Sequence, residues 1–135
     1  MLYMLMICYD PSVPADPAEQ NLQPEHAKLE NELRERGTFV SGAGLWPAET
    51  AKTVRLQDAK PVTMDGPFAE TKEAVGGYYI VDCDEGEAIA IAARLPVESR
   101  ARVQVRAIAP FHPNIERLRD VDGYVDPRLL RSSSQ

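Results

Sequence analysis

Apolar positions along the first 108 residues recur either at every second residue or at the three- and four-residue spacing of a helix. Alternation and short, bounded apolar runs are typical of strands, whereas the longer spacing indicates an amphipathic helix. Glycine and proline separate these runs and mark the turns between them. The strands that this pattern predicts span residues 2–9, 38–45, 52–57, 61–64, 77–82 and 102–108.

One helix is predicted over residues 24–36. Its inward-facing stripe has the spacing 4, 3 and 4, and consists of Leu22, His26, Leu29 and Leu33. Pro24 is tolerated in a first helical turn, and Gly37 stands where helices commonly end. Because His26 belongs to the apolar stripe, its imidazole is expected to point toward the sheet.

A second helix is predicted between Asp84 and Pro96. Asp84 and Glu87 resemble a capping box with Asp in place of the usual Ser or Thr. The apolar positions that follow have helical spacing, and they are Ala88, Ile91, Ala92 and Leu95. The short strand at 61–64 would close a hairpin with the strand at 52–57. Without the strand at 61–64, the elements follow the order β-α-β-β-β-α-β. This is the split βαβ order, so we predict an α+β fold: a ferredoxin-like protomer with an antiparallel sheet and two helices.

The strand at residues 2–9 is apolar on both of its faces. One face would carry Tyr3, Leu5, Ile7 and Tyr9, and the other Leu2, Met4, Met6 and Cys8. A strand in a sheet that is open to water on one side alternates apolar with polar residues, and this strand does not. Helices of the same chain can cover one face, and a second subunit is the simplest cover for the other. We therefore expect a homodimer.

The chain of 135 residues carries a formal net charge of −6. Nucleic acids and anionic membranes are bound through basic faces, so neither is an expected partner. The apolar run at residues 2–8 is too short for a signal or a membrane span. Two cysteines do not make a disulfide scaffold, which favours a reducing cytoplasm. We expect one domain over residues 1–110, and a C-terminal extension over 111–135 that is partly disordered or associated with the dimer.

The most specific stretch of the sequence is DGPFAETKEAVGGYY at residues 65–79. It opens with strong turn chemistry, and its glycine pair allows a tight turn into the next strand. The charged residues Asp65, Glu70, Lys72 and Glu73 gather around Phe68. On residue types alone, this is a surface turn whose Asp caps backbone amides and whose charges face water.

This stretch resembles the signature of the DGPF proteins, a branch of the YCII-related superfamily. The likeness continues through GGYYIVD and RVQVRAI, through the helix that contains His26, and through SGAGLWPAETAKTVRL at residues 41–56. It covers most of residues 1–108. The resemblance implies a ferredoxin-like protomer that pairs into a dimeric α/β barrel, in agreement with the two apolar faces of the first strand.

For activity, the resemblance points to small barrel enzymes such as muconolactone isomerase and chlorinated-hydroquinone dehydrochlorinases. A His–Asp pair in a cleft has been proposed as their catalytic centre. By motif position, His26 and Asp65 carry over as that pair. The DGPF branch also often lies beside genes for extracytoplasmic-function sigma factors, which implies a regulatory role instead.

His26 is a candidate on its own chemistry as well. The positive end of a helix dipole disfavours the imidazolium, so a histidine in the first turns stays neutral, as a general base must be. An Asp that accepts a hydrogen bond from one ring nitrogen would hold the tautomer and stabilise the charge that forms. The alternative is a core or interface histidine that is hydrogen-bonded to a backbone carbonyl.

Four further residues are candidates for substrate binding, namely Ser41, Phe68, Lys72 and Tyr79. Lys72 offers a cation for an anionic substrate, although a Lys beside acidic neighbours is also typical of a solvated surface. Ser41 would line the cleft or pack as a small residue under a helix. Tyr79 offers a hydroxyl for hydrogen bonding, with core packing as the alternative.

The sequence has neither a Gly-rich phosphate loop nor zinc-ligand spacing, so no cofactor and no metal is expected. A haem protein with His26 as axial ligand is the least favoured hypothesis. The first hypothesis is a cofactor-independent enzyme that isomerises or eliminates a small organic acid or phenolic compound by general acid/base proton transfer. The alternative is a non-catalytic ligand-sensing or protein-interaction module, such as a sigma-factor accessory.

Overall fold

The computed structural model describes residues 1–66 and 72–109 of the chain. The predicted substrate-binding residue Phe68 and the predicted extension at 111–135 lie outside these described residues. The boundary between a domain and an extension therefore stays a prediction.

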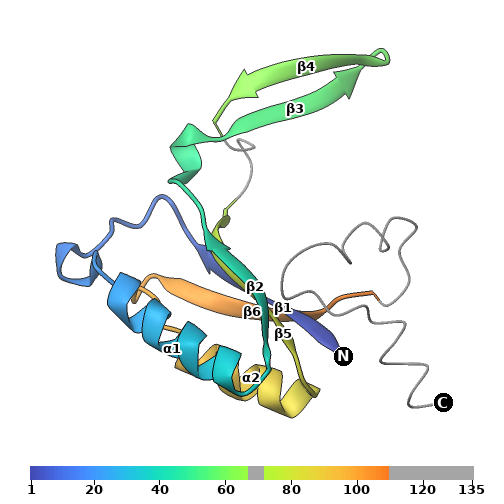
Figure 1. The fold of residues 1–135 in the computed structure, drawn as a ribbon. Helices are drawn as coiled ribbons and strands as arrows, with labels where there is room; N and C mark the ends of the chain where they lie inside the picture. The colour runs from blue at the N-terminus through green and yellow to red at the C-terminus, as the bar shows by residue number, and fades with distance from the viewer. Residues whose placement is uncertain (67–71, 110–135) are drawn as a thin grey trace.

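In the described residues, six strands and two α-helices follow one another in the order β1-α1-β2-β3-β4-β5-α2-β6 (Figure 1). Short 3-10 turns at Pro17–Glu19 and Ala48–Thr50 interrupt the connections that precede α1 and β3. The element bounds are β1 Leu2–Tyr9, α1 Gln23–Glu35, β2 Phe39–Gly44, β3 Lys52–Gln57, β4 Lys60–Asp65, β5 Ala74–Asp82, α2 Glu85–Arg94 and β6 Ala101–Ala107.

The main sheet has the strand order β2-β5-β1-β6, and its neighbouring strands are all antiparallel. The central strand β1 pairs with β5 on one side and with β6 on the other. The sheet order and the two helices confirm the predicted α+β, ferredoxin-like protomer. Strands β3 and β4 form a separate two-stranded sheet, which is an insertion between β2 and β5.

The end of α1 and the start of α2 lie where the sequence predicts them. Gly37 adopts a φ of +71°, and the amides of Gly37 and Thr38 donate to the carbonyls of Arg34 and Leu33. These two bonds form the Schellman motif that glycine permits at a helix end. Asp84 accepts a 2.7 Å hydrogen bond from the amide of Glu87, which confirms Asp84 as the N-cap of α2.

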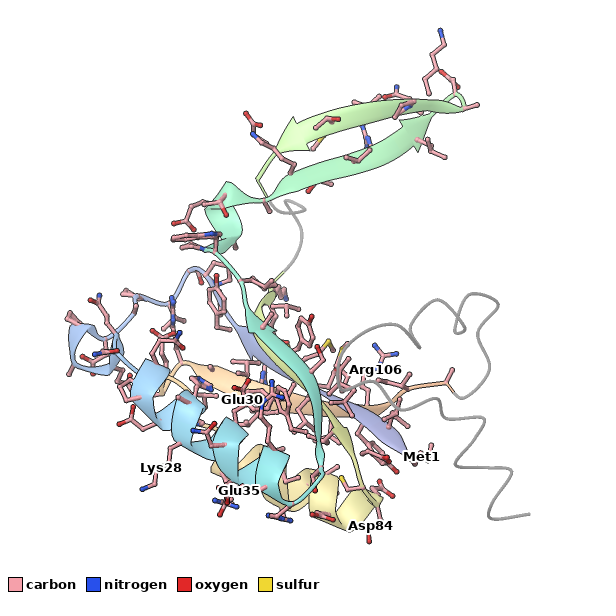
Figure 2. All side chains as sticks on the ribbon, viewed as in Figure 1. Met1, Lys28, Glu30, Glu35, Asp84 and Arg106 are labelled. Carbon is pink, nitrogen blue, oxygen red and sulfur yellow. The ribbon has the colours of Figure 1, made fainter. Side chains whose placement is uncertain are left out.

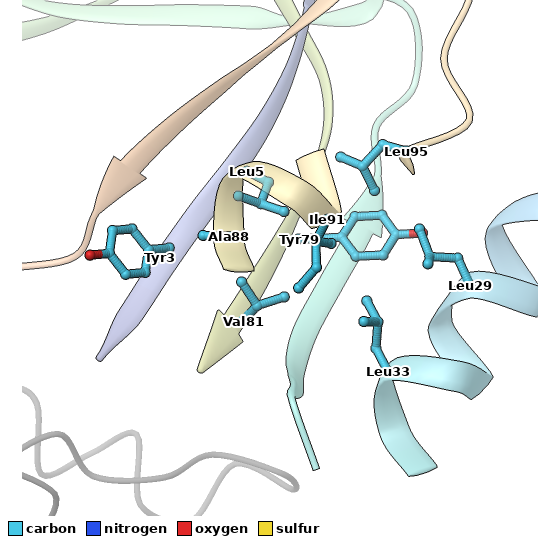
Figure 3. Close-up of a cluster of buried hydrophobic side chains, with 9 residues drawn as sticks. All are labelled: Tyr3, Leu5, Leu29, Leu33, Tyr79, Val81, Ala88, Ile91 and Leu95. Carbon is cyan, nitrogen blue, oxygen red and sulfur yellow. The ribbon is translucent and has the colours of Figure 1, made fainter. Parts of the chain in front are cut away.

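The hydrophobic core lies between the two helices and one face of the main sheet. Figure 3 shows side chains of β1 and β5 meeting those of both helices in this layer. Leu5, Leu33, Val81 and Ile91 are fully buried, and each such side chain stabilises the fold by about 1.5–3 kcal/mol. The core members are Tyr3, Leu5, Leu29, Leu33, Tyr79, Val81, Ala88, Ile91 and Leu95.

Strand β5 begins at Ala74, three residues before its predicted start at residue 77. Gly76 and Gly77 therefore lie inside the strand rather than in a turn that leads into it. The register between β1 and β5 shifts between Ile7 and Cys8, which pair with Gly77 and Val75, so Gly76 is the extra residue of a β-bulge. A Cβ on Gly77 would lie 2.9 Å from the carbonyl oxygen of Ala43, so close backbone approach explains that glycine.

The β3–β4 hairpin, called the arm below, stands away from the main sheet and both helices (Figure 1). Its turn residues Asp58 and Ala59 have φ values of 51° and 64°, as a tight two-residue hairpin loop requires. Lys52 pairs with Asp65 where the arm leaves the body. The arm follows the predicted strands closely, but the sequence did not indicate that it would project.

Candidate functional site

A cleft of about 310 Å³ lies between α1 and the neighbouring strands β2 and β5. Helix α1 contributes side chains from two successive turns, and β2 and β5 contribute mostly backbone and small residues. The cleft is at the small end of the range for ligand sites, so it suits a small molecule. Its lining residues are Ile7, Gln23, His26, Ala27, Glu30, Phe39, Gly42, Ala43, Gly44, Gly76, Gly77, Tyr78 and Tyr79.

His26 and Tyr79 form a hydrogen-bonded pair in the wall of this cleft. The Nδ1 atom of His26 lies 2.8 Å from the hydroxyl oxygen of Tyr79. The two rings are tilted by 33° with their centroids 5.8 Å apart, and Phe39 packs edge-on against Tyr79. The side chains of the pair are held on α1 and β5, two elements of the packed core.

Burial lowers the pKa of His26 below its ordinary value, because desolvation disfavours the imidazolium. A hydrogen bond with the backbone of Pro96 and the charge of Glu25 oppose this effect. Proline has only a carbonyl to offer, so this bond requires an N–H on the imidazole. In the neutral tautomer whose Nδ1 carries no proton, the ring accepts a hydrogen bond from the Tyr79 hydroxyl.

Burial also raises the pKa of Tyr79 to about 12, and the negative charge of Glu30 adds to the shift. Tyr79 is therefore a protonated hydroxyl at neutral pH, as the hydrogen bond to His26 needs. Glu30 lies on the side of α1 that faces the sheet, whereas Lys28 points away from it (Figure 2). The site thus combines a neutral imidazole, a neutral phenol and one carboxylate.

Glycines in β2 and β5 keep space for the cleft. A Cβ on Gly42 would lie 3.0 Å from the carbonyl oxygen of Tyr78, and a Cβ on Gly77 would lie 2.9 Å from the carbonyl oxygen of Ala43. The φ values of both are ordinary, so the space between the strands is the reason for glycine here. By contrast, a Cβ on Gly44 would meet nothing within 4 Å.

The predicted pair of His26 and Asp65 is not brought together within one chain. Asp65 ends β4 in the arm, where its carboxylate pairs with Lys52 and its side chain is 87% exposed. The sequence-based pairing rested on motif position and on the resemblance to the YCII-related superfamily. The projecting arm instead carries Asp65 away, and the Tyr79 hydroxyl occupies the place next to Nδ1 of His26.

The predicted substrate-binding residues are distributed differently. Tyr79 lines the cleft, although its role toward a substrate stays a prediction. Ser41 in β2 pairs with Ile80 in β5. Because side chains alternate along a strand, Ile80 points to the face opposite Tyr79, and so does Ser41. Ser41 is accordingly not among the residues that line the cleft. Lys72 is exposed just before β5 and does not line the cleft either. Phe68 lies outside the described residues.

Sequence reasoning missed three groups that this site uses: Gln23, Glu30 and the carbonyl of Pro96. Gln23 and Glu30 stand three residues before and four residues after His26, which places them on the same helical face. That spacing is visible in the sequence and was the available indication. The role of Pro96 has no local signature, because it depends on how the segment after α2 returns past α1.

The described residues also bear on metal binding and on the reactivity of Cys83. Within residues 1–66 and 72–109, no group of three or more His, Cys, Asp and Glu side chains could hold a metal ion. Burial and the nearby charges of Glu87 and Asp84 raise the pKa of the Cys83 thiol to about 11. Cys83 is therefore a protonated thiol at neutral pH. In the same residues, no helix is long and apolar enough to cross a membrane.

The fold and the cleft together define a ferredoxin-like α+β protein with a small cleft beside its first helix, in whose wall His26 contacts Tyr79. The sequence profile of the YCII-related domain matches residues 1–112. The chain belongs to this YCII-related family, which confirms the resemblance found in the sequence. It is also similar to an uncharacterized protein of Rhizobium meliloti (strain 1021), with 31% identity over 119 residues. That alignment covers 84% of this chain and 96% of the relative.

Proposed function

We propose that this chain is a cofactor-independent enzyme that moves a proton on a small phenolic or other neutral hydroxy compound. The observation that carries the proposal is the 2.8 Å contact between His26 Nδ1 and the Tyr79 hydroxyl at the wall of the cleft. A neutral imidazole beside a protonated phenol is a ready path for one proton.

The proton path runs through Tyr79 to His26. A substrate O–H or activated C–H gives its proton to the Tyr79 oxygen while the Tyr79 proton passes to Nδ1 of His26. Hydrogen bonding with the backbone of Pro96 and the charge of Glu25 both favour the imidazolium that forms. Return of the proton to a different substrate atom completes an isomerisation, and departure of a leaving group completes an elimination.

The charge of the cleft favours a neutral substrate over a free acid. Glu30 is the charged side chain among the described lining residues, and no Lys or Arg is among them. Arg34 lies 3.7 Å from Glu30 and stacks over Phe39, but it stands outside this lining. A carboxylate ligand would meet repulsion from Glu30, which lines the cleft directly, and Arg34 outside the lining offsets this repulsion only in part. Of the two classes expected from the sequence, the phenolic compound is therefore preferred over the organic acid.

The assay for this function is proton exchange in heavy water. A panel of small phenols and cyclic ketones is incubated with the protein in D₂O, and carbon-bound deuterium is measured by NMR. We expect exchange with at least one compound, and a loss of about 10²-fold in both His26→Gln and Tyr79→Phe. Exchange that persists unchanged in both variants, or that never exceeds the protein-free rate, would contradict the proposal.

The ligand class is tested with matched compounds. Phenol and benzoate have similar size and differ in charge at neutral pH, so their binding to the cleft can be compared by ligand-observed NMR. We expect phenol to bind more tightly, and Glu30→Gln to raise the affinity for benzoate. Tighter binding of benzoate to the unaltered protein would exclude the neutral substrate class.

The alternative is a non-catalytic ligand-sensing or protein-interaction module, such as an accessory to an extracytoplasmic-function sigma factor. The exposed apolar side chains of the arm favour a role in binding another protein. Ligand binding without proton exchange would support this alternative.

We further propose a cytoplasmic homodimer in which a second copy faces the side of the sheet opposite the helices, where Met4, Met6 and Ile80 are half-buried.

A further inference from the structure

A second cleft adjoins the cleft of His26 on the side of the main sheet that the helices cover. It has a volume of about 420 Å³, and the two clefts share Ile7 and Gly76 in their walls. Figure 1 shows that the end of β1, the start of α1 and the start of β6 lie at one end of the main sheet, where this second cleft forms. The two clefts therefore follow one another along β1, so one ligand can reach into both.

One residue at the boundary of the two clefts has no side chain. Gly76 is the extra residue of the bulge in β5, and a Cβ there would lie 3.2 Å from the ring of Tyr9. Tyr9 lines the second cleft, and its hydroxyl accepts a 3.1 Å hydrogen bond from the amide of Ala48. Gly76 thus leaves room for the Tyr9 ring. Among the described residues that border both clefts, Ile7 alone contributes a side chain.

Arg100 is the positively charged residue in the wall of the second cleft, and its side chain is only 18% exposed. Its guanidinium carbon lies 4.5 Å from the centre of the Tyr9 ring. Nε donates a 3.1 Å hydrogen bond to the Glu98 carboxylate, and Nη1 donates a 2.7 Å hydrogen bond to the carbonyl of Val13. These three contacts hold the planar fork in one orientation, so little side-chain freedom is lost when a ligand binds to it.

The donors of Arg100 and the charges around it favour a neutral acceptor. A guanidinium has five N–H groups, and the two hydrogen bonds above use two of them, which leaves up to three for a ligand within the described part of the chain. The second cleft also contains Glu98 and Glu19, and the Glu19 carboxylate accepts hydrogen bonds from the amide and the hydroxyl of Ser99. The two carboxylates outweigh the one guanidinium and disfavour a ligand carboxylate. A carbonyl oxygen accepts hydrogen bonds without carrying a charge.

We propose that the two clefts form one elongated site, and that its ligand is a phenol whose side chain carries a carbonyl group. This inference rests on the proposed function, because it places the phenol beside His26 and Tyr79, while the carbonyl oxygen accepts from Arg100. Tyr79 pairs with Leu5, and Tyr9 follows four residues later in β1, a separation of about 13 Å. A phenol with a four-carbon side chain, hydrogen-bonded at both ends, spans roughly this distance. Together the two clefts reach the middle of the volume range of ligand sites.

The test compares two matched compounds on the full chain. The probe 4-(4-hydroxyphenyl)butan-2-one and the reference 4-butylphenol have the same ring and the same chain length, and they differ in the carbonyl oxygen. Calorimetry gives both dissociation constants. We expect the ketone to bind about 10-fold more tightly, because its carbonyl accepts a hydrogen bond from a charged donor.

Two arginine variants assign this preference to its donor. Arg100→Met keeps the apolar stem of the side chain and removes its N–H groups, so it should abolish the preference for the ketone. The readout is the ratio of the two affinities in the same variant, which a general loss of stability does not mimic. The matched control is Arg102→Met, which should keep the ratio, because Arg102 pairs with Glu73 and lines neither cleft.

Intermolecular NOEs locate the two ends of the ketone in the unaltered protein, so this measurement needs no variant. We expect NOEs from the ring protons of the ketone to Tyr79, and from its terminal methyl group to Tyr9. NOEs confined to the first cleft would refute the elongated site. Equal affinities for the two compounds, binding of neither, or a preference that survives Arg100→Met would refute it as well.

The outcomes also separate this inference from the proposed function. Carbon-bound deuterium exchange of phenol in D₂O, without a preference for the ketone, would overturn the elongated site alone. Binding of the ketone through Arg100 with no exchange in any compound would support the elongated site and contradict the enzyme.

Discussion

The Nδ1 atom of His26 lies 2.8 Å from the hydroxyl oxygen of Tyr79, although 53 residues separate the two in the chain. The contact joins α1 to β5, the strand that pairs with the central strand β1. It gives the imidazole a partner that is uncharged and protonated over the whole physiological range, because the pKa of Tyr79 is raised to about 12. The pair therefore differs in kind from a histidine oriented by a carboxylate.

A histidine titration tests this partnership directly. In the folded protein we expect the NMR titration of His26 to give a pKa below 6.5, because burial disfavours the imidazolium. Tyr79→Phe should move that pKa, since it removes the hydrogen-bond partner. Asp65→Asn should leave it in place, because Asp65 lies in the arm with Lys52. A shift with Asp65→Asn and none with Tyr79→Phe would restore the His–Asp pair.

The Tyr79 hydroxyl should also contribute to stability. Tyr79→Phe leaves Nδ1 of a half-buried imidazole without its partner, at a cost of about 1–3 kcal/mol in the free energy of unfolding. Tyr78→Phe makes the same chemical change at the next position of β5 and should cost less than about 0.5 kcal/mol. Urea unfolding of the two variants measures the difference. Equal costs would mean that the hydroxyl of Tyr79 has no special partner.

The stability of the chain should fall on acidification through the titration of His26. The folded-state pKa lies below the unfolded value of about 6.5, so the unfolded chain binds more protons between the two values. The contribution of the neutral imidazole is fully present above pH ~6.5 and is lost as the pH falls through the folded-state pKa. His26→Gln should abolish this part of the pH dependence in urea titrations. A pH profile that His26→Gln leaves unaltered would mean that His26 is not the group involved.

The glycines of the cleft should differ in what they tolerate. The Cβ of Gly77→Ala would lie 2.9 Å from the backbone of Ala43, an overpacking that costs about 1–3 kcal/mol and narrows the cleft. Gly44 lines the same cleft, but a Cβ at this position has open space around it. Gly44→Ala should therefore change the free energy of unfolding by less than about 0.5 kcal/mol. Thermal unfolding of both variants measures the contrast. If the two glycines tolerate alanine equally well, β2 and β5 do not approach as closely as described.

Much of the fold was readable from local patterns. The stripe of α1, its end at Gly37 and the cap at Asp84 depend on residues within one or two turns, and the structure confirms all three. The hairpin over residues 58–60 was also predicted. The exception was Gly76–Gly77, which reads as a turn in the sequence. Both glycines lie inside β5, where a Cβ on Gly77 would crowd the carbonyl of Ala43 and a Cβ on Gly76 would crowd the ring of Tyr9.

The sequence by itself determined the elements, their order and the family, because periodicity, capping and a long motif are properties of neighbouring residues. It also singled out His26 and Tyr79 separately. Only the tertiary structure decided that these two meet, since the contact depends on how α1 packs across β5. It likewise decided that Asp65 leaves the site, because an inserted hairpin carries it outward. Contacts between distant segments follow from packing, which no local pattern encodes.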